Sequence, residues 1–168
     1  WYGVINLEGD YIIKPEHIDE FKRINDDYFL ARADLFDYNG NKVFEHSSEK
    51  IGYSNEIFRG TDYYGKHPEY FDYQGNPITK KGSYDEGKPF HEDFAVVSFK
   101  GKSSYINKAG KLISPLKFSI CFNFSNDLGV VKKLNESKYG AINGNGEIVI
   151  PMEYANAESR FQEGLLAV

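Results

Sequence analysis

One short motif recurs five times at nearly constant spacing, and it limits the fold more than any other feature of the sequence. The motif is an apolar or aromatic residue, then Asn or Asp, two variable residues and Gly. Its glycines lie 31, 35, 35 and 36 residues apart, and they are Gly9, Gly40, Gly75, Gly110 and Gly146. Such a period is typical of repeat architectures, in which each copy is one supersecondary unit.

Each copy of this motif predicts the turn of a β-hairpin. An Asn or Asp side chain can cap such a turn, and Gly can adopt the positive φ that closes it. Apolar residues resume after the turn, as in residues 11–13 and 148–150. The motif therefore predicts two antiparallel strands in every unit.

A second pattern lies between these hairpins, in which an aromatic residue or Ile is followed four positions later by an apolar strand. Its five copies are Ile24 to Tyr28, Tyr53 to Ile57, Phe90 to Phe94, Phe124 to Leu128 and Phe161 to Leu165. Acidic residues or Gly fill the spacer, which suits a tight turn. Each unit thus offers at least three strands in a meander.

The two patterns predict one all-β domain of five degenerate antiparallel β-meander repeats, each about 35 residues long. The units are 1–32, 33–62, 63–99, 100–137 and 138–168. Because one meander cannot bury its apolar face alone, the units must stack, either as a β-propeller-like ring or as an open β-solenoid of hairpins. We favour the propeller-like arrangement, because pairing of the last strand with the first would remove two free edges. The chain begins inside a unit, without an initiator Met, so we expect it to be part of a longer polypeptide.

Charge and hydropathy narrow the classes of partner. The chain carries 20 Lys plus Arg against 25 Asp plus Glu, a net charge of −5, and its basic residues are scattered. Nucleic acids and anionic membranes both need a dense cationic face, so neither is expected as the main partner. No run approaches the roughly 18 apolar residues of a membrane span, so no direct membrane insertion is expected.

The last copy of the motif resembles the bacterial WG repeat, a family named for a Trp-Gly pair. The resemblance rests on Tyr139-Gly140, the turn ending at Gly146, the Val149-Ile150-Pro151 strand and the Phe-x-x-Gly-Leu-Leu-Ala-Val segment 161–168. The opening Trp1-Tyr2-Gly3 is similar to the same family, whereas the middle copies carry other residues in the Trp-Gly position. The resemblance implies a repeat fold without an established catalytic activity, and it supplies no functional residues.

No catalytic signature is present in the sequence. It has no Gly-x-Ser-x-Gly elbow, no phosphate-binding loop and no His-Glu-x-x-His pair. Cys121 lies between phenylalanines, which indicates a buried apolar residue more than an activated thiolate. The histidines fall at different phases of the repeat and are interpreted as loop or surface residues; they are His17, His46, His67 and His91. We therefore expect no enzymatic activity, no cofactor and no metal site.

Aromatic residues separate into two groups by their phase in the repeat. Those locked to the repeat are predicted core residues, namely Phe36, Phe71, Phe90, Phe124, Tyr139 and Phe161. Less regular tyrosines gather around the third unit and form the predicted binding face, namely Tyr63, Tyr64, Tyr70, Tyr73 and Tyr84. Exposed Tyr gives rigid, amphipathic contact area that suits protein interfaces and sugar stacking.

Two functions from different classes fit these features. The first is a non-catalytic scaffold module that binds a protein partner, because repeat surfaces are general binding platforms. The alternative is a lectin-like module that binds a glycan, which predicts equivalent aromatic residues at equivalent phases of the repeat. An enzyme ranks third, and it would need two carboxylates, or a His and a carboxylate, converging in a deep pocket.

Overall fold

The computed structural model of the chain describes residues 2–16, 21–31 and 33–168, so Trp1 and His17 lie outside the described residues. Within these ranges every regular element is a strand, and no helix could cross a membrane. The strands are β1 (Tyr2–Ile5), β2 (Tyr11–Glu16), β3 (Phe21–Arg23), β4 (Tyr28–Ala31), β5 (Asp34–Asp37), β6 (Lys42–Glu45), β7 (Lys50–Ser54), β8 (Ile57–Thr61), β9 (Glu69–Phe71), β10 (Glu86–Gly87), β11 (Phe94–Phe99), β12 (Lys102–Asn107), β13 (Phe118–Cys121), β14 (Leu128–Lys133), β15 (Tyr139–Asn143) and β16 (Ile148–Tyr154).

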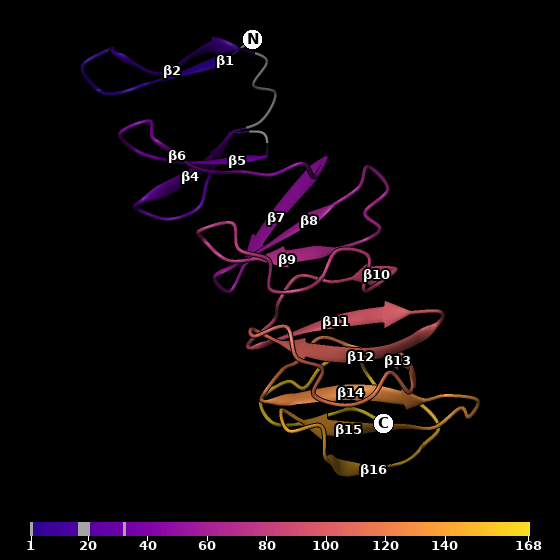
Figure 1. Cartoon of the computed structure of the whole chain (residues 1–168). Helices are drawn as coiled ribbons and strands as arrows, with labels where there is room; N and C mark the ends of the chain where they lie inside the picture. Colours follow the sequence, from indigo (N-terminus) through magenta and orange to yellow (C-terminus); the bar gives the residue numbers. More distant parts are fainter. Residues whose placement is uncertain (1, 17–20, 32) are drawn as a thin grey trace.

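The strands form antiparallel meanders, in which each strand pairs with its neighbour along the chain. The sheets are β1-β2, β3-β4-β5-β6, β7-β8-β9 and β10 to β16, and a single residue pair, Ser103 with Phe118, joins β12 to β13. Figure 1 shows these sheets following one another from β1 and β2 at one end to β16 at the other. The predicted fold class, all-β with stacked antiparallel meanders, is confirmed. Among the described residues, β1 pairs only with β2, and the segment 165–168 does not pair with it, so the favoured closing pair between the last strand and the first is absent and the array is open.

The sheets are out of phase with the predicted units by about half a repeat. The boundaries after residues 32, 62, 99 and 137 fall between β4 and β5, β8 and β9, β11 and β12, and β14 and β15, which are neighbours within sheets. A complete sheet therefore combines the second-pattern hairpin of one unit with the glycine-turn hairpin of the next. The sheet β3–β6 has this form, and so do strands β13–β16.

The five glycine turns have the predicted geometry. Their glycines all have positive φ, between 73° and 90°. At Asn143, the side-chain oxygen accepts hydrogen bonds from the backbone N–H groups of Asn145 and Glu147, both at 3.0 Å. The same pair of bonds, to the residues two and four positions later, recurs in the other four copies.

The second pattern also forms tight turns, and these turns touch one another from repeat to repeat. Asn126 and Asp127 have φ of 52° and 60°, as a two-residue hairpin turn of type I′ requires. The backbone N–H of Asp127 donates to Glu92 Oε2 at 3.1 Å. Asn55 Nδ2 in turn donates to the carbonyl oxygen of Glu92 at 2.7 Å. These partners lie one repeat apart, so the turns form a continuous edge of the array.

The hydrophobic core consists of clusters that lie between successive repeats. One cluster packs Val96 and Tyr105 of one repeat against Phe124 and Ile142 of the next. Of the predicted core aromatics, Phe36 and Tyr139 are half-buried, and the buried ones are Phe71, Phe90, Phe124 and Phe161. Cys121 is buried as predicted, and burial raises the pKa of its thiol to about 12.

Three of the five glycine turns also make direct backbone contact with the preceding repeat. A Cβ on Gly40 would lie 2.9 Å from the carbonyl oxygen of Ile12, and one on Gly146 would collide with that of Ile113. Gly110 stands in the same relation to Ile78. Only glycine permits this close approach, because any side chain there would push the repeats apart.

Candidate functional site

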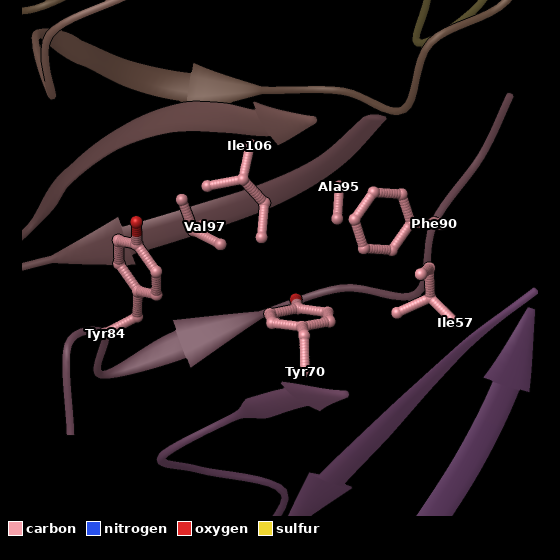
Figure 2. Close-up of a cluster of buried hydrophobic side chains, with 7 residues drawn as sticks. All are labelled: Ile57, Tyr70, Tyr84, Phe90, Ala95, Val97 and Ile106. Carbon is pink, nitrogen blue, oxygen red and sulfur yellow. The ribbon is translucent and has the colours of Figure 1, made fainter. Parts of the chain in front are cut away.

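The five tyrosines of the predicted binding face do not lie on one surface. Tyr70 and Tyr84 are 0% and 7% exposed, and Figure 2 shows them among the buried residues of one cluster. The Tyr70 hydroxyl donates to the carbonyl oxygen of Lys88 at 2.7 Å, and burial raises its pKa. The prediction that these two tyrosines form a binding face is therefore wrong, because both are buried in a core cluster between two successive sheets.

Tyr73 is half-buried at the edge formed by the turns. Its hydroxyl is hydrogen-bonded to that of Tyr53 and also accepts a bond from Asn25 Nδ2 at 3.3 Å. Burial, together with the bond from Tyr53, raises the pKa of Tyr73. This hydroxyl links the turns of two neighbouring sheets, so its polar group is used within the protein.

Tyr63 and Tyr64 are the members of the set that reach the surface, with 65% and 84% exposure. Their rings meet edge to face with centroids 5.5 Å apart. They form the tip of a turn between β8 and β9 that is closed like the five predicted turns. Asp62 Oδ1 accepts from the N–H of Lys66 at 2.7 Å, and Gly65 has φ of 76°.

This sixth turn was missed by sequence reasoning, although its Asp-x-x-Gly spacing is that of the repeated motif. The search required an apolar residue before the Asp, and Thr61 occupies that position. Thr61 is buried and pairs with Lys50 in the β7–β8 hairpin. The extra turn therefore adds a protruding loop without altering the strand pairing around it.

A cavity of about 670 Å³ lies beside this turn, lined by residues of β3–β6, the segment 46–49 and β7. The volume falls in the range usual for ligand sites. Acidic and basic side chains both line it, namely Lys22, Asp34, Glu45, His46, Glu49 and Lys50. Lys50 connects the cavity to the exposed turn, because its Nζ lies 4.8 Å from the centre of the Tyr63 ring.

His46 is the most constrained polar group of this cavity. Its ring stacks on Phe71 with centroids 4.2 Å apart, and its Nδ1 accepts a hydrogen bond from the backbone N–H of Ser48 at 3.1 Å. Burial lowers the pKa of His46, against the opposing effect of Glu69, whose Oε2 lies 3.7 Å from Nε2. Neutral His46 therefore carries its proton on Nε2, facing a carboxylate beyond hydrogen-bond distance.

No pattern in the sequence indicates this cavity. His46, Glu49 and Lys50 have the composition of an ordinary polar loop, and the cavity exists only where two sheets meet. His46 lies in a loop, as predicted, but it is half-buried, whereas His67 and His91 are exposed. In the described ranges, no group of three or more His, Cys, Asp or Glu side chains is placed to hold a metal ion.

Comparison with protein families finds one match that extends over most of the chain. The model of the family described as "WG containing repeat" matches residues 2–34, 70–102, 104–136 and 139–168. The stretch between the first two matches, 35–69, contains Tyr63, Tyr64 and most of the charged lining of the cavity. None of the curated proteins matches the chain.

Similar solved structures include Kluyveromyces lactis Hsv2 with its complete loop 6CD. It is 15% identical, with a TM-score of 0.44, over 78% of this chain and 47% of that one. A structure of a nidogen/laminin complex is 10% identical, with a TM-score of 0.36, over 80% of this chain and 59% of that one. Both are β-propeller-like folds, and this chain spans about half the length of each.

Proposed function

The chain belongs to the WG containing repeat family, and we propose that it is a non-catalytic module that binds a protein partner. The proposal assigns the binding face to Tyr63, Tyr64 and the adjoining cavity, which together we call the tyrosine face. In this proposal the stacked repeats serve as a support. The tyrosine face is the surface for recognition, and it is present in one repeat and not in the others.

The observation that carries the proposal is the exposure of two neighbouring tyrosines at the tip of an ordered turn. When a partner covers an exposed aromatic ring, the burial of its apolar surface contributes favourable free energy to binding. Tyr is accordingly enriched at protein interfaces. Asp62 and Gly65 fix the turn, so little conformational entropy is lost when a partner binds. The charged cavity beside it supplies polar contacts for orientation.

The position of this face within the array also supports the proposal. Tyr63, Tyr64 and most of the charged cavity lining lie in the segment 35–69, which the family model does not match. Residues that maintain the stacking are fixed by their phase in the repeat, whereas Tyr63 and Tyr64 belong to an extra turn and contribute little to the core. Side chains free of the stacking requirement are available for recognition.

A pull-down from native extract, with cross-linking at native abundance, tests the proposal. The wild-type chain is expected to recover a protein in stoichiometric amount, and the double variant Tyr63→Ala, Tyr64→Ala to lose it. Tyr2→Ala is the matched control, because Tyr2 is equally exposed but lies on β1 at the far end of the array. Equal recovery by both variants, or no recovered protein at all, would contradict the proposal.

Glycan binding is a second candidate, favoured by the volume and polarity of the cavity beside the tyrosine pair. An aromatic ring next to hydrogen-bonding side chains suits a sugar, which stacks on one face and bonds at its rim. The exposed tyrosine turn occurs once and outside the repeat phase, which counts against the equivalent aromatic positions that a lectin-like repeat predicts and confines this candidate to one sugar site per chain. A glycan array with no signal above background would eliminate it.

The absence of catalysis is part of the same proposal and rests on how the candidate groups are placed. His46 uses Nδ1 to accept the Ser48 N–H and its Nε2 faces Glu69, so among the described residues neither nitrogen of His46 is hydrogen-bonded to a hydroxyl or thiol that it could activate. Cys121 is buried with a raised pKa, which disfavours the thiolate. Hydrolytic turnover that is lost in His46→Gln would refute this part of the proposal.

A further inference from the structure

Two cavities lie at junctions between successive groups of strands, and they occupy the same place in the repeat. The first is the cavity of about 670 Å³ beside the tyrosine turn, at the junction of β6 with β7. The second has a volume of about 190 Å³ and lies at the junction of β12 with β13, two junctions further along the array. The strand pairing on either side of each cavity establishes that the two places are equivalent.

One wall of each cavity comes from the second strand before the junction turns to the next repeat. Leu30 of β4 lines the first cavity, and Val96 of β11 lines the second. Leu30 pairs with Leu35, and Val96 pairs with Tyr105. Leu35 and Tyr105 each lie five residues before the glycine of their repeat, so Leu30 and Val96 hold the same position.

The opposite wall comes from the first strand after the junction. Ile51 of β7 lines the first cavity, and Cys121 of β13 lines the second. Ile51 pairs with Gly60, and Cys121 pairs with Val131. Gly60 and Val131 are both the fourth residue of their strands, β8 and β14, so Ile51 and Cys121 also hold the same position.

The junction of β9 with β10, which lies between these two, holds a side chain at the equivalent place. Arg59 is the third residue of β8, as Leu30 is of β4 and Val96 is of β11. Arg59 pairs with Tyr70, which again lies five residues before its glycine. The arginine side chain therefore starts from the position that Leu30 and Val96 hold beside the cavities.

Gly87 of β10 receives the Arg59 side chain from across this middle junction. Arg59 Nη1 donates a hydrogen bond to the carbonyl oxygen of Gly87. Gly87 pairs with Val97, the fourth residue of β11, so it holds the position of Ile51 and Cys121. The guanidinium thus spans the two positions that face each other across the cavities at the other two junctions.

The carbonyl oxygen of Cys121 is oriented like the one that accepts from Arg59. The N–H of Phe122 donates to the carbonyl oxygen of Val130 at 2.9 Å, so the adjoining pair, Cys121 with Val131, is of the non-hydrogen-bonded kind. The backbone groups of Cys121 therefore point away from β14. The carbonyl oxygen of Gly87 points away from β11 for the same reason. A ligand in the second cavity thus meets a backbone acceptor at the same place.

The polar groups of the two cavities suit a guanidinium. This group has several N–H donors, and the buried Nε–H of Arg59 has no hydrogen-bond partner among the described residues. Both cavities offer acceptors for such donors, namely the half-buried carboxylate of Asp34 in the first and the carboxylate of Glu86 with three serine hydroxyls in the second. Lysines also line the cavities, but they are exposed, so their ammonium groups can stay in water when a ligand enters. These lysines are Lys22, Lys50 and Lys88.

We propose that each of the two cavities binds an arginine side chain of a protein partner, in the place that Arg59 fills at the middle junction. Three successive junctions then have one arginine position each, of which the chain fills one and the partner fills two. For the first cavity the inference rests on the proposed function, because the same partner would cover Tyr63 and Tyr64. The second cavity lies outside the tyrosine face and adds a separate contact.

An NMR titration of the isotope-labelled chain with the peptide acetyl-Gly-Arg-Gly-amide tests the proposal before any partner is identified. The backbone signals of Ile51 and Cys121 are expected to shift until both cavities are saturated. The same peptide with citrulline in place of arginine keeps the shape but loses the charge, and it should bind about tenfold more weakly. Equal binding of the two peptides would overturn the proposal, and so would a signal that fails to shift, for the cavity concerned.

Variants change the number of arginine positions that the chain leaves open. Leu30→Arg and Val96→Arg supply a guanidinium from within, as Arg59 does, so each should abolish the shift at its own cavity and keep the shift at the other. Leu30→Met is the matched control, because it keeps the size of the side chain without the charge and should bind like the wild type.

Arg59→Ala gives a test that introduces no buried charge and so does not depend on the folding of the arginine variants. It opens the middle junction, and the arginine peptide is expected to shift the signal of Gly87, which the peptide leaves unchanged in the wild type. The absence of this third site would overturn the inference that the three junctions are equivalent.

Failure of this proposal can be told apart from failure of the proposed function. Peptide binding that follows these variants, with no protein recovered in the pull-down, would support the arginine sites and contradict the assignment of the tyrosine face. Recovery of a protein that depends on Tyr63 and Tyr64, but is equal for the wild type and the double variant Leu30→Arg, Val96→Arg, would overturn the arginine sites and leave the tyrosine face in place.

Discussion

Two regions of this array use the same repeat in different ways. In β11–β16 the sequence follows the repeat closely, and the turns are short. In β7–β9 an extra turn carries Tyr63 and Tyr64, and a charged cavity lies alongside. The segment after Gly75 pairs through one bridge, Phe71 with Pro77, as the segment after Gly110 does through Ile106 with Leu112. Both regions keep the same strand register. The comparison shows that a repeat can carry an additional turn and a cavity while its strands keep the common hydrogen-bonding register.

The glycines give the sharpest test of that difference. Gly146→Val is expected to lower the free energy of unfolding by about 3–4 kcal/mol, because strain at positive φ adds to a collision with the carbonyl oxygen of Ile113. Gly65→Val should lose only about 1–2 kcal/mol, because Gly65 has the same φ but an open surround. Urea denaturation of both variants measures the two losses. Equal losses would mean that the glycine turns carry no packing between repeats.

Two buried tyrosines test whether the irregular region keeps the common core. Tyr105 and Tyr70 lie five residues before their glycines, and each donates to a carbonyl oxygen of the next repeat at 2.7 Å. Tyr105→Phe and Tyr70→Phe should each cost about 1–2 kcal/mol, because each leaves a part-buried carbonyl oxygen without this donor. Chemical denaturation compares them. If Tyr105→Phe lowers the free energy of unfolding and Tyr70→Phe does not, the tyrosine hydrogen bond would not contribute to stability in β7–β9 as it does in the regular repeats.

The pH dependence of stability is expected to differ between wild type and His46→Gln. His46 has a lowered pKa in the folded protein, so the unfolded chain binds the proton more readily. Stability should be complete above the ordinary value of 6.5 and fall as the pH decreases from 6.5 toward the folded pKa. The variant should lack this part of the decline, which unfolding free energies measured between pH 8 and 5 will show. Parallel curves would mean that His46 titrates normally.

The smallest effect on stability is expected at the tyrosine face. Tyr63→Ala and Tyr64→Ala should each change the free energy of unfolding by less than about 0.5 kcal/mol, because both rings are exposed. Thermal or urea unfolding of the single variants checks this value. A loss comparable to that of Tyr70→Phe would show that these rings serve the fold, and it would remove the basis for assigning them to binding.

Local chemistry explains which features the sequence could predict. The Asn143 and Gly146 turn is determined within five residues, so its caps and positive φ were predictable. Burial was predictable only where it follows the period, as for Phe124. Tyr84 and Tyr70 were misassigned because both are buried between two successive sheets, and the cavity beside His46 also arises between sheets. Contacts between repeats depend on the stacking geometry, which the motif does not encode.

The contacts between repeats described above, within the part of the chain that the structure describes, all join adjacent repeats, and this has a consequence for the history of the chain. The backbone of Asp127 touches Glu92, one period away, and each core cluster draws on neighbouring sheets alone. If the gene segment that encodes one whole repeat is duplicated or deleted, the repeats on either side of the change still pack through the same contacts. An insertion of a few residues inside a strand would instead misalign the ladder. Descendants of such a gene are therefore expected to differ in length by multiples of one period, with smaller insertions confined to loops such as the one that carries Tyr63.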